Sequence, residues 1–85
     1  MEIHQMGVAG TLQSNDCMIR LLPAEKKEII LDSPVAYEFG DQIRNVVEKE
    51  LAEAGLEKVR VEIDDKGALD CTIAARLQTA IRRAK

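Results

Sequence analysis

The chain has 85 residues, 46% of them hydrophobic and 32% charged, and this composition indicates one small folded domain over residues 1–85. A formal net charge of −3 and only two aromatic residues argue against nucleic acid as the partner, because phosphate backbones need clustered cations and bases need stacking platforms. We find no apolar run long enough to cross a bilayer and no signal-peptide pattern, so we expect a cytoplasmic protein without a membrane partner.

The first two predicted strands flank the polar stretch TLQSND, residues 11–16. Small or apolar residues alternate with others on both sides of it, at positions 8, 10 and 12 and at positions 17, 19 and 21. Pairing Leu12 with Cys17 places all six on one face of a hairpin, with Ser14 and Asn15 at the tip. We expect a positive φ at Asn15 and amide contacts from the carboxylate of Asp16, which leaves Ser14 exposed.

A short third strand and a long helix follow. The segment EIIL, residues 28–31, is the strand. Asp32 or Ser33 can cap a helix that has Pro34 in its first turn and ends at Gly55. Apolar residues recur along this helix at steps of three and four, which predicts one buried face: Phe39, Ile43, Val46, Val47, Leu51 and Ala54.

The last third predicts a strand, a turn and a second helix. Val59, Val61 and Ile63 alternate with charged residues, and DDKG, residues 64–67, turns the chain. The second helix has a stripe of Leu69, Ile73, Leu77, Ile81 and Ala84. The element order β-β-β-α-β-α predicts an α+β fold of two layers, with a mainly antiparallel sheet of about four strands and two helices packed on one face.

Catalysis by this chain is not expected from its residues. A serine nucleophile needs a base within hydrogen-bond reach, and the only histidine, His4, lies near a terminus that we expect to be loose. The G-x-S-x-G motif of serine hydrolases is absent. Asp64 and Asp65 lack the further ligands of a metal loop and are better explained by turn chemistry. On these grounds alone Ser14 is a turn serine.

The remaining reactive and charged residues favour structural interpretations. Cys17 and Cys71 lack a metal-binding spacing, and we expect both to face the core as reduced thiols. The basic cluster at the end of the chain fits cations placed near the negative pole of a helix: Arg76, Arg82, Arg83 and Lys85.

Three separated blocks change the interpretation of Ser14. VAGTLQSNDCMIRLLP, EFGDQIR and VEIDDKGALDCTIAARLQTAI occur in the same order as in the acyl carrier protein, or gamma subunit, of citrate lyase, which this chain resembles from about Val8 onward. The resemblance implies that Ser14, in its T-L-x-S-x-D block, carries 2'-(5''-phosphoribosyl)-3'-dephospho-CoA through a phosphodiester. The chain departs from the family where an acidic residue is common before this serine and Gly or Ser after it, having Gln13 and Asn15 instead.

The resemblance also implies a non-catalytic subunit with defined partners. A prosthetic-group transferase would load Ser14, and the arm's thiol would hold acetyl and then citryl as thioesters. The alpha subunit would exchange the acyl groups, and the beta subunit would cleave citryl to oxaloacetate and regenerate the acetyl form. We hypothesise from charge that Arg20 or Lys26 contacts the arm's phosphates.

Parts of the other two blocks can reflect either packing or docking. We expect Leu69, Ile73, Phe39 and Ile43 to belong to the core. Subunit contact stays open for the polar residues that we expect to be exposed, which are Asp41, Gln42 and Asp70.

Two alternatives stay open at this point. One is the delta subunit of malonate decarboxylase, a carrier that resembles the same family and uses the same type of arm. The other is an unmodified adaptor that binds a protein through its sheet edge or its helices. An all-helical acyl carrier protein is disfavoured, because its serine begins a helix in a D-S-L motif, whereas Ser14 lies between strand-like segments.

Overall fold

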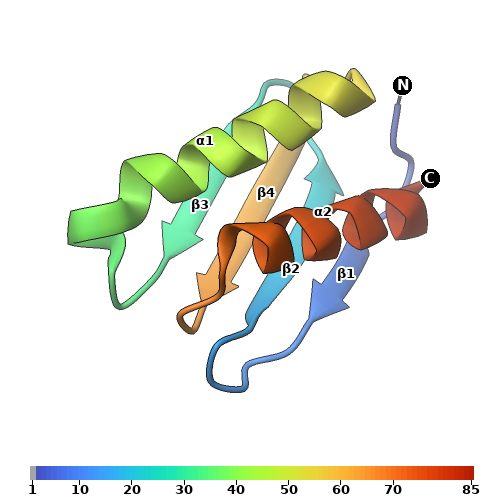
Figure 1. Ribbon diagram of the computed structural model, residues 1–85. Helices are drawn as coiled ribbons and strands as arrows, with labels where there is room; N and C mark the ends of the chain where they lie inside the picture. Colours follow the sequence, from blue (N-terminus) through green and yellow to red (C-terminus); the bar gives the residue numbers. More distant parts are fainter. Residues whose placement is uncertain (1) are drawn as a thin grey trace.

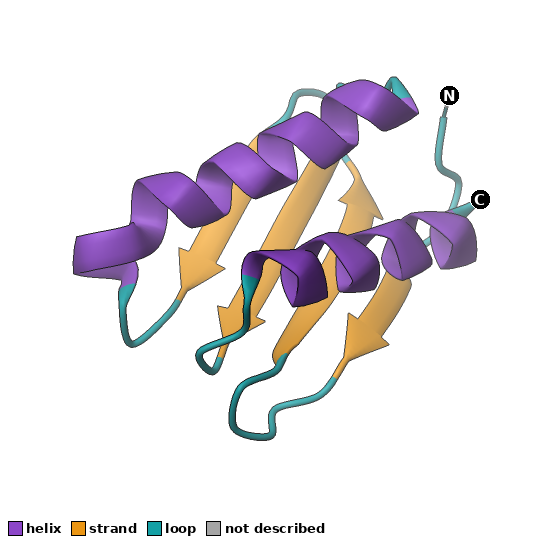
Figure 2. Cartoon of the chain, viewed as in Figure 1, coloured by secondary structure: helices purple, strands orange, loops and turns teal. Residues whose placement is uncertain are grey.

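The computed structural model describes residues 2–85 as a four-stranded sheet with two helices on one of its faces (Figures 1 and 2). The elements are β1 (Gly7–Gly10), β2 (Cys17–Pro23), β3 (Glu28–Asp32), α1 (Ala36–Ala54), β4 (Val59–Asp65) and α2 (Asp70–Ala84). This architecture confirms the predicted α+β fold and its order β-β-β-α-β-α.

The sheet has the strand order β1-β2-β4-β3 and is mostly antiparallel. β2 pairs antiparallel with both β1 and β4, whereas β3 and β4 run parallel. A parallel pair cannot be joined by a tight turn, and α1 supplies the crossover between β3 and β4. Because β2 and β4 run antiparallel, with Cys17 opposite Asp65, the β1–β2 loop and the β4–α2 turn lie at the same end of the sheet (Figure 1).

The core lies between the sheet and the two helices and is aliphatic, as the near absence of aromatic residues predicts. The alternation of β2 and β4 points one side of each strand into this core, with exposed fractions of 0–2%. These inward residues are Cys17, Ile19, Leu21, Val59, Val61 and Ile63. The helices close the core from above with Ile43, Val47, Leu51, Ile73, Leu77 and Ala80.

The predicted register of β1 against β2 was wrong by one residue. Ala9, rather than Gly10, lies opposite Ile19, and Leu12 is 52% exposed. The reason is the close approach of α2, since a Cβ atom on Gly7 would lie 2.0 Å from the carbonyl oxygen of Ala80. The inward side of β1 therefore has to carry small residues, Gly7 and Ala9.

The ends of the helices also differ in part from prediction. Gly55 ends α1 in a left-handed conformation (φ 68°), as predicted. Pro34, however, precedes the helix and does not lie in its first turn. The hydroxyl of Ser33 accepts a hydrogen bond from the Val35 amide at 3.2 Å, but no side chain caps α1 itself. Phe39 and Leu69 are 51% and 70% exposed, so their assignment to the core was wrong. Both lie at the N-terminal ends of the helices, where the spacing of apolar residues continues beyond the packed interior.

The N-terminal segment is fixed to the end of α2, contrary to the expectation that it is loose. The amides of His4 and Gln5 both donate to the carbonyl of Ala84, and Ile3 is buried.

Within residues 2–85, no helix combines the length and the apolar character that crossing a membrane requires.

The contact between Gly7 and α2 predicts that Gly7→Ala destabilises the fold by about 1–3 kcal/mol or more, because backbone atoms of α2 have to move. Gly40→Ala is the matched control, since its Cβ would have no neighbour closer than 3.9 Å and it lies inside α1. That variant should be stabilised by about 0.4–1 kcal/mol. Urea unfolding measures both, and equal stabilities of the two variants would contradict this packing.

Candidate functional site: the Ser14 loop

Ser14 lies at the midpoint of the loop that joins β1 to β2. The base of the loop is closed by the Thr11 amide, which donates to the Cys17 carbonyl at 3.2 Å, and by the Asp16 amide, which donates to the Gln13 carbonyl at 3.2 Å. Asn15 has the predicted positive φ, 67°. Ser14 is exposed, and its hydroxyl has no hydrogen-bond partner among residues 2–85. The position predicted for Ser14 is correct even though the register was not, because the observed register is centred on Ser14 itself.

Asp16 anchors the loop through both oxygens of its carboxylate. Oδ1 accepts from the Cys17 amide at 2.7 Å and from Arg76 Nε at 3.1 Å. Oδ2 accepts from Thr11 Oγ1 at 2.7 Å and from Arg76 Nη2 at 2.8 Å. The Arg76 guanidinium, followed by the Thr11 hydroxyl and the Cys17 amide, holds the pKa of Asp16 well below its ordinary value. The carboxylate thus stays ionised and ties the loop to α2.

A second anchor joins the loop to the turn after β4. The Asn15 amide donates to the Lys66 carbonyl at 2.8 Å, and the Lys66 amide donates back to the Asp16 carbonyl at 2.9 Å. Asn15 and Asp16, which follow Ser14, are therefore bonded to two other elements, and Thr11 and Gln13, which precede it, are bonded within the loop, while Ser14 itself stays exposed.

Asp64 and Asp65 are the last residues of β4 and do not lie in the turn as predicted. Asp65 is buried, and its carboxylate accepts from Ser33 Oγ at 2.7 Å and from the Ala68 amide at 2.9 Å. It therefore stabilises the turn from inside the sheet.

Within residues 2–85, no cluster of three or more acidic, histidine or cysteine side chains could hold a metal ion.

Arg76 was predicted to belong with the cations at the end of the chain, and this prediction was wrong. Arg82 and Arg83 do lie in the last turn of α2, and Arg83 also donates to the Val8 carbonyl at 2.7 Å. Arg76 lies earlier in the helix and reaches the Ser14 loop. Its spacing from Ile73 and Ala80 places it on the same side of α2 as the apolar stripe, and this spacing is the signal that could have indicated its role.

The two cations suggested from charge do not lie beside Ser14. Arg20 is in β2, where its Nη1 atom lies 3.6 Å from Glu62 Oε1. Lys26 follows Pro23 at the opposite end of β2, a strand of seven residues and hence about 20 Å long. The geometry gives neither residue a place in the loop.

The two cysteines differ in their environments. Cys17 is fully buried as predicted, and burial, with smaller effects from Asp16 and Asp65, raises the pKa of its thiol to about 11. Cys71 is exposed on α2, so the prediction that it faces the core was wrong. It lies two residues before the buried Ile73, which turns its side chain toward another side of the helix.

Among residues 2–85, no base lies within hydrogen-bond distance of the Ser14 hydroxyl. His4, the only histidine of the chain, is bonded through its amide to Ala84 at the far end of α2. Asp16 is occupied by its hydrogen bonds to Thr11, Cys17 and Arg76. An accessible oxygen on a fixed loop of a small domain is what a carrier offers to a separate modifying enzyme.

Comparison with known proteins identifies the class of carrier. A family model described as the malonate decarboxylase delta subunit, an acyl carrier protein (ACP) family, matches residues 4–84. The citrate lyase acyl carrier protein of Treponema denticola is 52% identical over 99% of this chain and 97% of its own length. The proteins of the same name from Haemophilus influenzae and Lacticaseibacillus casei are 44% and 52% identical over 99% of this chain and 88% and 84% of their own lengths.

These matches establish that the chain is an acyl carrier protein. It belongs to the family of citrate lyase acyl carrier proteins.

The anchor at Asp16 predicts a specific dependence of stability on pH. Because folding lowers the pKa of Asp16, its contribution is complete above the unfolded value of about 3.9 and is lost as the pH falls from there toward the lowered value. Asp16→Asn should therefore unfold more easily than wild type near neutral pH, and this difference should shrink below about pH 4. Urea unfolding at a series of pH values measures the difference.

Asp41→Asn provides the control, because it makes the same change of net charge at an exposed position of α1. A constant stability difference between Asp16→Asn and wild type throughout the acid range would show that the carboxylate does not hold the loop.

Proposed function

We propose that this protein is the acyl carrier subunit of citrate lyase and that Ser14 carries 2'-(5''-phosphoribosyl)-3'-dephospho-CoA through a phosphodiester. The observation that carries the proposal is the exposed Ser14 hydroxyl, which has no hydrogen-bond partner among residues 2–85 and lies between two fixed neighbours. The names and full-length similarity of the relatives support the choice of complex.

The residues of the loop fit an attached group of this kind. A phosphodiester requires an oxygen that an enzyme can reach, and a bulky substituent on that oxygen must not displace packed side chains. Leu12, Gln13 and Asn15 are exposed together with Ser14, so the region around the hydroxyl is open. When bound, the group supplies a thiol that holds the acyl substrate as a thioester.

The contribution of this chain is to tether and position. Asp16, Arg76 and Lys66 fix the base of the loop, so that the arm swings from one defined point. A tether raises the effective concentration of the substrate at each active site that the arm can reach. We infer that these sites belong to the alpha subunit, which exchanges acyl groups, and the beta subunit, which completes the cleavage of citrate to oxaloacetate and acetate. Catalysis in this proposal belongs to those cytoplasmic partners.

The delta subunit of malonate decarboxylase is the second candidate, and the description of the matching family model favours it. Reconstitution separates the two candidates. Protein loaded on Ser14 should restore citrate cleavage to carrier-free citrate lyase subunits, and restoration of malonate decarboxylation instead would support the second candidate.

Intact-mass spectrometry tests the attachment site directly. Wild-type protein co-expressed with the enzymes that make and attach the arm should gain the mass of one CoA-derived group, and Ser14→Ala should gain none. Ser33→Ala is the matched control, because Ser33 is the only other serine and its hydroxyl is bonded to Asp65; it should be modified like wild type. No added mass on wild type would favour the unmodified adaptor, and modified Ser14→Ala protein would refute the assignment of the residue.

A further inference from the structure

A groove of about 610 Å³ lies between the N-terminal ends of α1 and α2, next to the β4–α2 turn. Its lining is mainly apolar and includes Phe39, Ile43, Ala68 and Leu69. Phe39 is 51% and Leu69 is 70% exposed, although residues of this type are usually buried in so small a domain. Two of the large apolar residues that stay exposed in the folded protein therefore line this groove.

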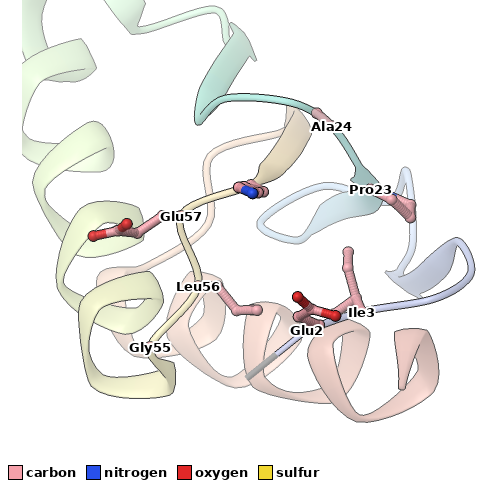
Figure 3. A pocket seen from close by; sticks show the side chains of 8 residues that line it. Glu2, Ile3, Pro23, Ala24, Gly55, Leu56 and Glu57 are labelled. Carbon is pink, nitrogen blue, oxygen red and sulfur yellow. The ribbon is translucent and has the colours of Figure 1, made fainter.

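The groove lies beside the turn that is bonded to the Ser14 loop. Gly67 belongs to its lining, and the neighbouring Lys66 exchanges backbone hydrogen bonds with Asn15 and Asp16. A protein that contacts Ser14 therefore meets this groove next to it. A second hollow of about 410 Å³, shown in Figure 3, is lined by Ile3, Pro23 and Leu56 and lies at the opposite end of β2, away from Ser14.

The charges of the groove are of one sign. Asp65 lies in its lining and Asp70 at its exposed rim, where Asp70 accepts from Gln42 Nε2 at 2.9 Å. None of the described residues that line it is Lys, Arg or His. An apolar floor with carboxylates nearby is complementary to an apolar side chain that has Lys or Arg beside it. The same charges disfavour the arm itself as the occupant, because its phosphates are negative.

We propose that this groove is the docking site of the enzyme that attaches the arm to Ser14, which inserts an apolar side chain flanked by a basic one. The inference rests on the proposed function. Enzymes that act on the thiol work at the far end of a long arm and need not contact the carrier beside Ser14. The attaching enzyme must bring its own reactive centre to the Ser14 oxygen, so it has to cover the surface next to the loop.

Steady-state kinetics of attachment test this proposal. The purified unmodified carrier is the varied substrate, the attaching enzyme and its CoA-derived donor are the probe, and intact mass is the readout. Phe39→Ala and Leu69→Ala should each raise the KM for the carrier about tenfold, as truncation of a central anchor does, while kcat changes by less than about twofold. Asp70→Asn should raise KM less and reduce its dependence on salt.

Matched controls come from exposed residues outside the groove. Ile30→Ala removes an apolar side chain that is 44% exposed on β3, and Glu57→Gln removes a carboxylate at the second hollow. Both should keep the wild-type KM. Circular dichroism checks that each variant is folded, and titration of ¹⁵N-labelled wild-type carrier with the enzyme should shift the amides of Gly67, Ala68 and Cys71.

The outcomes separate the two proposals. If the groove variants keep the wild-type KM and the amides do not shift, Ser14 is modified without docking in the groove and this proposal is wrong. If wild type itself gains no mass, the proposed function fails and the docking proposal fails with it.

Discussion

The ion pair between Asp16 and Arg76 determines where Ser14 lies. One carboxylate accepts four hydrogen bonds, from Thr11, from the Cys17 amide and twice from the guanidinium of Arg76. These bonds join the ends of the loop to each other and to α2, and the pKa of Asp16 is lowered because each of them favours its ionised form. A flexible polar loop thereby becomes a fixed part of the domain, with only its middle left in water.

This constraint suits the role proposed for the chain as a carrier. A modifying enzyme needs an accessible hydroxyl in a reproducible position, and an arm that visits several active sites needs a defined point of attachment. The bonds between Lys66 and the loop extend the fixed region to the β4–α2 turn and the groove beside it. Loop, turn and groove together form one surface, which a partner can recognise as a unit.

Local patterns in the sequence were sufficient for most of the fold. Alternation located β2 and β4, Gly55 ended α1, and the turn preferences of Asn15 placed Ser14 in an exposed loop. The register of β1 was not predictable in this way, because Gly7 faces inward only on account of the approach of α2. The pairing of Arg76 with Asp16 was missed as well, because Arg76 lies 60 residues further along the chain and its helical spacing indicates only that it is on the apolar side of α2. Such pairs depend on tertiary packing, which a local pattern does not encode.

Hydrogen exchange of the backbone amides in the native, unmodified protein tests the fixed loop most directly. The Asn15 and Cys17 amides, which donate to the Lys66 carbonyl and the Asp16 carboxylate, should exchange far more slowly than the Ser14 amide that precedes them, and Arg76→Ala should remove much of this protection. If Asn15 and Cys17 exchange as fast as Ser14 in the wild-type protein, the loop is not anchored and the account given for Ser14 is wrong.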